Sequence, residues 1–380
     1  MSTPYWHQLF PATPPSARQD FGMVALPSYQ ELLLFGGDAH PNHFAPLNDL
    51  YTFNCVTSQW SQRSPSGTPP SPRWGFAMAL DSIRNRVVIH GGVDISTEYF
   101  GDTLEYSRSD DTWYTMTPTF SPPDLRGRHA MAFDPIHGEC IMHAGLKQYP
   151  PGGDQWDTYG YDGVTWTQYF TATSPSEYFA NPPPFNLAGL EFHRMEWDPI
   201  RQKVLLYGGF PRRVLANPGG GAFLYNFNFV FAWDGDAKEW ILLQEGKPSE
   251  IDAGKAPGPK DFAFVYPPGE TQYSYGRILT TFRSFPPLGR LLLHAGWGYP
   301  SSPSDLQDLW SFRTDVNEWI ELVVTPTPGA RESHDMSYDA LNSRMIMFGG
   351  LHGTYPQVLK NDTWELVIPP PTLVSFNYHT

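Results

Sequence analysis

The sequence predicts an all-β fold, a six-bladed β-propeller in which six four-stranded sheets surround a central channel. Three observations predict it. An apolar run ending in two small residues recurs six times, an arginine stands at one fixed distance before five of these pairs, and a tryptophan follows after most of them. One supersecondary unit repeated along a chain is the sequence signature of propellers and solenoids.

The apolar runs are the clearest repeated element. They are LLLFGG (32–37), VVIHGG (87–92), CIMHAG (140–145), VLLYGG (204–209), LLLHAG (291–296) and MIMFGG (345–350). Short apolar runs bounded by glycine predict buried strands that end in turns. We assign each run to the second strand, b, of a repeated unit.

The arginine positions mark the first strand of each unit. The residues 18 positions before the first small residue of each pair are Arg18, Arg73, Arg126, Leu190, Arg277 and Arg331. Strand a is expected to start at this position. An aspartate and then a tryptophan follow the small pair, and they predict strands c and d. The pairs are Asp49 and Trp60, Asp102 and Trp113, Asp157 and Trp166, and Asp308 and Trp319, while the fourth unit has Trp240 without the aspartate. We expect the tryptophans to pack between blades and the aspartates to accept turn hydrogen bonds or to pair with the arginines.

The N-terminus is expected to close the ring. The sixth unit stops after NDTWEL (361–366) without a tryptophan, whereas Trp6 precedes Arg18 by 12 residues, as Trp319 precedes Arg331. The first segment therefore completes the last blade, which leaves only short edges exposed. The expected single domain has blades at 17–70, 71–123, 124–184, 185–260, 261–329 and 330–366 with 4–16, followed by a tail at 367–380.

This pattern resembles the Kelch-repeat β-propeller family. The glycine pairs, the spaced tryptophans and the arginine offset carry the resemblance from Tyr5 to about Leu366. Segments such as YDGVTWTQ (161–168) are more similar to bacterial Kelch repeats than to the adaptor type that is joined to a BTB domain. The resemblance implies that the d–a and b–c loops share one face, where many Kelch domains hold peptides, often through arginines. The Kelch family also includes six-bladed mutarotases, which are enzymes. The motifs of copper- and iron-dependent relatives are absent from this sequence.

Composition disfavours several classes of partner. There are 39 acidic against 25 basic residues, a formal net charge of −14, which argues against nucleic acid and anionic membranes. Cys55 and Cys140 fall in different repeats and do not predict a disulfide framework. We expect a cytoplasmic protein because neither a signal-like segment nor an apolar run of about 20 residues is present.

Expanded connections break the symmetry around blades four and five. The spacing from tryptophan to the next arginine position is 12 or 13 residues in four units, but 24 after Trp166 and 37 after Trp240. The longest b–c loop, 208–229, also lies in blade four. Long loops beside a rigid scaffold often carry function. We expect these loops to form a lid over the central funnel, with Tyr178, Phe264 and Tyr275 facing the ligand.

Ionisable residues also enter strand a unevenly. Histidine stands three residues after the arginine position in three units, at His129, His193 and His334. Glu191 and Glu332 precede the last two by two residues, and residues i and i+2 share one face of a strand. Blades four to six further carry Arg194, Glu196, Arg283 and Asp335 where blades one to three have small or apolar residues.

A carboxylate beside an imidazole suits general acid–base catalysis. One hypothesis is therefore a small-molecule-binding propeller with isomerase-, cyclase- or lyase-type chemistry on a small polar ligand. His193 and His334 would be the acid and base, and Glu191 and Glu332 would orient them. The expected substrate-binding residues are Arg194, Glu196, Arg283, Asp335, Arg331, Arg277, His129, Tyr178, Phe264 and Tyr275.

Two alternatives stay open. No cofactor is predicted, although a divalent metal at the histidine–glutamate cluster is an alternative. The competing function is a protein-interaction propeller that binds a peptide or protein on the loop face. In that case the histidines are scaffold and the charges are buried ion pairs. The catalytic hypothesis requires His193 and His334 to share one cavity.

Overall fold

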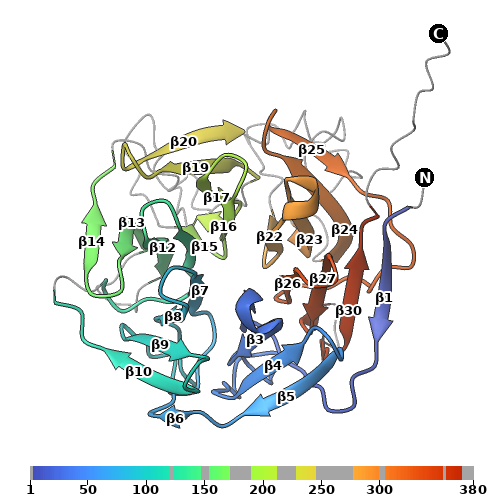
Figure 1. The fold of residues 1–380 in the computed structure, drawn as a ribbon, viewed down its shortest axis with the longest axis horizontal. Helices are drawn as coiled ribbons and strands as arrows, with labels where there is room; N and C mark the ends of the chain where they lie inside the picture. Colours follow the sequence, from blue (N-terminus) through green and yellow to red (C-terminus); the bar gives the residue numbers. More distant parts are fainter. Residues whose placement is uncertain are drawn as a thin grey trace, which may run out of the picture.

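The computed structural model describes residues 3–119, 123–146, 154–171, 190–211, 228–244, 277–298, 304–353 and 357–369, without the side chains of 154–156, 210–211, 277–278, 298 and 304–305. These residues form six blades, sheets of four or five strands arranged in a ring, and two further two-stranded pairs (Figure 1). The predicted six-bladed propeller is confirmed. The described residues contain no helix long and apolar enough to cross a membrane.

Blades one to three follow one another along the chain. Blade one contains β2 (Gly22–Leu26), β3 (Glu31–Phe35), β4 (Leu50–Asn54) and β5 (Gln59–Arg63). Blade two contains β7 (Ala77–Asp81), β8 (Arg86–His90), β9 (Thr103–Ser107) and β10 (Thr112–Met116), with β6 (Ser66–Gly67) parallel to β10. Blade three contains β11 (Ala130–Asp134), β12 (Glu139–Leu146), β13 (Asp154–Tyr161) and β14 (Trp166–Tyr169).

Blades four to six carry additional short strands. Blade four contains β16 (Arg194–Asp198), β17 (Lys203–Tyr207), β19 (Val230–Asp234) and β20 (Glu239–Gln244), beside the pair β15 (Leu190–Glu191) and β18 (Phe210–Pro211). Blade five contains β22 (Thr281–Phe285), β23 (Arg290–Gly298), β24 (Ser304–Arg313) and β25 (Glu318–Glu321), with β21 (Arg277–Ile278) paired to β23. Blade six contains β26 (Asp335–Asp339), β27 (Arg344–Phe348), β30 (Thr363–Val367) and β1 (Tyr5–Leu9), beside the pair β28 (Leu351–His352) and β29 (Val358–Leu359).

The N-terminal strand closes the ring as predicted. Strand β1 pairs antiparallel with β30, so that Trp6 stands opposite Leu366. In Figure 1 the blue β1 lies along the outer edge of the red β30. The last blade is therefore built from both ends of the described chain, which covers an edge that would otherwise expose unpaired backbone groups.

The predicted tryptophans lie between the blades. All six strand-d tryptophans are buried, at 3% exposure or less. Trp60 Nε1 of blade one donates a hydrogen bond of 3.0 Å to Thr363 Oγ1 of blade six. Trp166 and Trp240 make the same bond to Thr103 and Thr158 of the preceding blade. Each such tryptophan thus combines apolar burial with a satisfied indole N–H, as a buried indole requires.

The repeated arginines are internal ion pairs. Arg18 is fully buried, and its Nη1 lies 2.6 Å from Asp49 Oδ1 and 3.0 Å from the carbonyl oxygen of Gly36. The same arrangement holds at three further arginines, which pair with the aspartate that opens strand c: Arg73 with Asp102, Arg126 with Asp157, and Arg331 with Asp362. The predicted arginine–aspartate pairing is confirmed. The offset of 18 residues is fixed because each Nη1 also reaches the carbonyl at the end of strand b.

A ring of backbone hydrogen bonds surrounds the channel just before strand a. The second residue after each arginine position has positive φ; the six are Asp20, Gly75, Arg128, Phe192, Leu279 and Ser333. Five of their amides donate to the equivalent carbonyl of a neighbouring blade, for example Asp20 to Ser333 at 3.1 Å. Between blades four and five, the described bond at this end comes from a side chain, Arg194 Nε to the carbonyl of Thr280 at 2.6 Å.

Candidate functional site

The predicted catalytic histidines lie in two different blade interfaces. His334 Nε2 is 2.9 Å from Nδ1 of His294, between blades six and five. His193 packs edge-on against His143, between blades four and three, with ring centroids 5.8 Å apart. A third pair, His90 and His129, repeats this arrangement between blades two and three. The motif is thus a repeated feature of the blade contacts.

Burial determines the protonation of these histidines. Burial lowers the pKa of His90 and of His143 to about 3, and nearby Arg126 acts in the same direction on both. The pKa values of His129, His193 and His334 are also well below the ordinary range, again chiefly through burial. These imidazoles are therefore neutral near pH 7.

The structure does not bring the predicted acid–base groups together. His193 and His334 have different ring partners, His143 and His294, and neither histidine lines the pocket described below. Glu191 accepts a hydrogen bond of 2.9 Å from Arg128 Nη1. The backbone of Glu332 pairs with Leu351. The single cavity that the catalytic hypothesis requires is not formed by these groups in the described part of the chain.

The predicted binding residues separate into three groups. Arg331 is fully buried and its charge is matched by Asp362, which leaves no guanidinium to hold a ligand anion. His129 is buried in the contact between blades two and three. Tyr178, Phe264, Tyr275 and the side chain of Arg277 lie outside the described residues. Only the charged group on the inner strands remains.

Arg283 joins four blades across the middle of the channel. Its Nη2 lies 2.6 Å from Asp335 Oδ2 of blade six, and its Nη1 lies 3.1 Å from Glu196 Oε2 of blade four. Its Nε and Nη2 also donate to the carbonyl oxygens of Met336 and Met23, of blades six and one. Asp335 in turn accepts the amide of Met23 at 3.0 Å. The charged residues of blades four to six are thus linked into one network.

Burial and pairing oppose each other in this network. Burial lowers the pKa of Arg283, but Asp335 and Glu196 outweigh it, so the net shift is upward. Burial raises the pKa of Glu196, although Arg283 acts in the opposite direction. Burial lowers the pKa of Arg194, although Asp335 opposes this. Arg283 therefore has ample negative partners, whereas Glu196 is only partly compensated.

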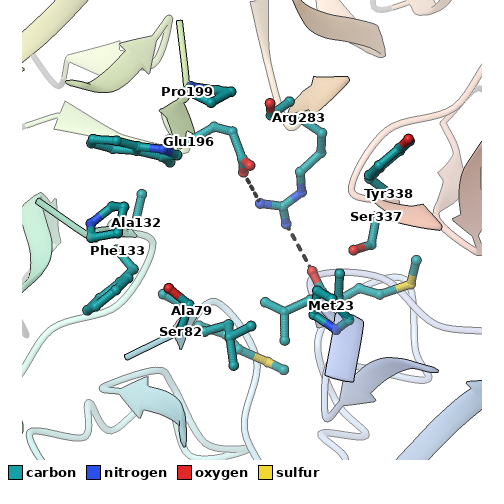
Figure 2. Close-up of a pocket in the computed structure, with 18 of the residues that line it drawn as sticks. Met23, Ala79, Ser82, Ala132, Phe133, Glu196, Pro199, Arg283, Ser337 and Tyr338 are labelled. Atoms are coloured by element: carbon teal, nitrogen blue, oxygen red, sulfur yellow. Dashed lines mark hydrogen bonds and ion pairs between the residues drawn. The ribbon is translucent and has the colours of Figure 1, made fainter. Parts of the chain in front are cut away.

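A pocket of about 350 Å³ opens in the channel beside this network. Figure 2 shows Glu196 and Arg283 reaching toward each other, with Phe133 and Tyr338 on opposite sides. Its wall includes prolines from the a–b turns, among them Pro27, Pro135 and Pro199. The pocket therefore lies at the a–b-turn end of the channel. The sequence-based expectation placed the site at the opposite end, beneath loops that lie outside the described residues.

The loop face carries an aromatic and cationic stack that the sequence did not reveal. The rings of His43 and Trp74 are parallel within 14°, with centroids 3.8 Å apart. The guanidinium carbon of Arg128 lies 5.1 Å from the Trp74 centroid and 4.9 Å from that of Phe192. We call His43, Trp74, Arg128 and Phe192 the loop-face stack. It spans blades one to four because each blade supplies one member.

Acidic groups hold two members of the loop-face stack, His43 and Arg128. Asp20 Oδ2 lies 3.6 Å from His43 Nε2, and Glu191 accepts from Arg128. The side chains of His43 and Arg128 keep 28% and 21% of their exposure. Exposed apolar side chains stand on the loops of the same face, at Phe44, Ile95 and Leu125. The surface therefore offers the part-exposed side chains of His43 and Arg128, which rest on the buried ring of Trp74, with an apolar rim around them.

Comparison with known proteins decides the family. A family model described as the KLHDC2/KLHL20/DRC7 Kelch-repeats domain matches residues 1–209, more than half of the chain. The chain belongs to the Kelch-repeat family. The structure extends the same four-stranded unit through the remaining blades, to β30 and β1.

Curated relatives match this chain over part of their own length. Kelch domain-containing protein 10 of Xenopus tropicalis is 28% identical over 219 residues, 56% of this chain and 49% of that protein. Tip elongation aberrant protein 1 of Schizosaccharomyces pombe is 27% identical over 188 residues, 47% of this chain and 15% of that protein. Multiple epidermal growth factor-like domains protein 8 of Rattus norvegicus is 32% identical over 147 residues, 37% of this chain and 5% of that protein. The chain thus matches half or less of each relative's length.

Proposed function

We propose that this Kelch propeller is a protein-interaction module that binds a peptide or protein segment on the face of its d–a and b–c loops. The loop-face stack is the observation that carries the proposal. Tryptophan and arginine are the residues most enriched at energetically dominant interface positions, particularly where rigid and surrounded by apolar contacts. Arg128 is held in that way, because its guanidinium lies over the buried ring of Trp74 while its side chain keeps 21% of its exposure, inside a rim that includes Phe44 and Ile95.

The small-molecule enzyme hypothesis has weaker support from the geometry. Its two histidines occupy separate interfaces, and the repeated arginines are paired inside the blades. The relatives match this chain over less than half of their own length, which fits a module that occurs within larger proteins. The interaction function therefore accounts for more of the described surface.

Site-specific photo-cross-linking in the native cell tests the proposal. A photoreactive amino acid replaces Phe44 on the loop face or Val316 on the opposite face; both positions are exposed, at 62% and 54%. We expect a partner adduct from position 44 and none from position 316. Arg128→Ala should weaken capture more than about tenfold, because it removes the centre of the stack.

Arg313→Ala is the matched control. Arg313 pairs with Asp315 and Glu318 at the surface of blade five, away from the stack. It should leave capture unchanged. Adducts that form only from position 316 would exclude the loop face as the binding surface. Adducts from position 44 that persist undiminished in a folded Arg128→Ala protein would exclude the loop-face stack as the centre of binding.

A further inference from the structure

The pocket at the a–b-turn end of the channel is a second site, on the face opposite the loop-face stack. Its walls are mainly apolar, and its sulfur-containing and aromatic members are Met23, Met78, Met131, Phe133, Trp197 and Tyr338. Aromatic faces attract cations, and methionine adapts its shape to varied apolar ligands. Exposed aliphatic side chains on four a–b turns extend this apolar surface beyond the pocket, at Ile83, Ile136, Ile200 and Leu341.

The polar part of the pocket favours a positive ligand. Every guanidinium nitrogen of Arg283 already donates to a protein acceptor, in Glu196, Asp335, Met23 or Met336. Among the described residues, four of its five N–H groups have acceptors and two carboxylates already face its charge, so an anion would find only one N–H, on Nη1, to bind. Asp335 takes most of this donor capacity through three contacts, whereas Glu196 receives one at 3.1 Å.

The Glu196 side chain also faces the pocket and keeps 23% of its exposure. Two carboxylates thus bind the Arg283 guanidinium here, and Arg194 also acts electrostatically on Asp335, so Glu196 is the less compensated of the two. The Oγ of Ser284, which also lines the pocket, is buried and has no hydrogen-bond partner among the described residues. A carboxylate and a hydroxyl together supply acceptors for an N–H donor that enters along the apolar wall.

We propose that this pocket binds an ammonium group carried on an apolar stem, with Glu196 as its counter-ion. A small alkylamine and a lysine side chain of another protein share this chemistry. The raised pKa of Glu196, caused chiefly by burial, agrees with a carboxylate that lacks a full positive partner. The proposal does not depend on the loop face, so either site can fail without the other.

Calorimetric titration of the full chain with three stem-matched probes tests the charge. We expect hexylammonium to bind with a stoichiometry of one, 1-hexanol roughly ten- to hundredfold more weakly, and hexanoate not at all, because a hydrogen bond to a charged group is lost or reversed. Glu196→Gln should weaken hexylammonium by the same factor and leave hexanol unchanged. Glu318→Gln, which alters an exposed carboxylate of blade five, is the matched control.

The pH dependence of hexylammonium binding gives a second measurement without a variant. Binding should weaken as the pH falls through the raised pKa of Glu196, because the protonated acid no longer attracts the cation. The charged groups that act on Glu196 are Arg283 and Asp335, and the backbone N–H of Ser284 also donates to it. Arginine keeps its proton across this range, which limits the interpretation to the carboxylates.

A lysine-containing peptide and its lysine-acetylated form distinguish the source. Tighter binding of the unmodified peptide than of hexylammonium indicates a protein lysine, while binding of hexylammonium alone indicates a small amine. Equal affinity for hexanol and hexylammonium would overturn the proposal, as would tighter binding of hexanoate. Absence of saturation by hexylammonium at millimolar concentration would overturn it as well.

Discussion

Acidification should destabilise this propeller through the histidines buried between its blades. His90 and His143 are fully buried, and each has its Nδ1 near the hydroxyl of a threonine, Thr103 or Thr158. Burial lowers the pKa of both to about 3, whereas an unfolded chain titrates near 6.5. The folded state therefore excludes protons that the unfolded state binds.

The direction and size follow from proton linkage. A depressed folded-state pKa contributes stability that is fully present above pH 6.5 and is lost as the pH falls from 6.5 toward 3. At pH 5 the unfolded histidine has gained nearly one proton, which costs about 2 kcal/mol per residue at 1.36 kcal/mol for each pH unit. His90 and His143 together account for about 4 kcal/mol, a large part of a typical folding free energy of roughly 5–15 kcal/mol.

Urea unfolding followed by tryptophan fluorescence between pH 7.5 and 5 measures this effect. The His90→Gln/His143→Gln variant should lose about 4 kcal/mol less than the parent over that range, since glutamine does not titrate. The difference isolates the two histidines because every other titrating group is shared. His7→Gln is the control, since the side chain of His7 is 62% exposed. A variant that retains the parent's full pH slope would refute the reasoning.

Three further perturbations test the architecture. Arg283→Met should cost roughly 3–5 kcal/mol of unfolding free energy in urea titrations, because it leaves Asp335 buried without its partner. The double variant Arg283→Met/Asp335→Asn should recover part of that loss, and equal costs for the single and double variants would contradict the network. Deletion of residues 1–10 removes β1 and exposes the edge of β30. Size-exclusion chromatography should then show self-association or loss of the folded monomer, and an unchanged monomeric profile would argue against closure of the ring by β1. Trp60→Phe removes the hydrogen bond to Thr363 and should lower the unfolding free energy by about 1–3 kcal/mol, because it leaves a buried hydroxyl unpaired. A change within error in urea titrations would show that the hydrogen bond is dispensable.

The repeat made the architecture predictable because each unit restates the same physical solution. The offset from Arg18 to Gly36 recurs since one guanidinium bridges strand a, the end of strand b and the start of strand c. Ring closure followed from the spacing of Trp6. Once the structure of one unit is understood, the other units can be placed from the same pattern. The local sequence is enough to define that unit.

The sites were less predictable because they depend on contacts between units. The loop-face stack draws on four blades, and Trp74 and Arg128 are not equivalent positions in their repeats. The position equivalent to Arg128 is aspartate, glycine, phenylalanine, leucine or serine in the other blades, so no shared residue type identifies this position as part of a site. The pocket is lined by the same methionines, alanines and prolines that would pack any inner strand.

The charged residues of blades four to six illustrate how support and binding can share one network. In the described part of the chain, the junction of blades four and five is bridged near the channel by the side chains of Arg194 and Arg283, while neighbouring junctions use backbone hydrogen bonds. A guanidinium that joins several blades needs carboxylates around it, and Asp335 binds two of its three nitrogens. The second carboxylate, Glu196, is therefore held in place by its contact with Arg283, yet its negative charge is only partly neutralised and faces the pocket. A group positioned by the scaffold and incompletely neutralised by it is what a cation-binding site requires, so the structural and the binding interpretations of this sector are compatible.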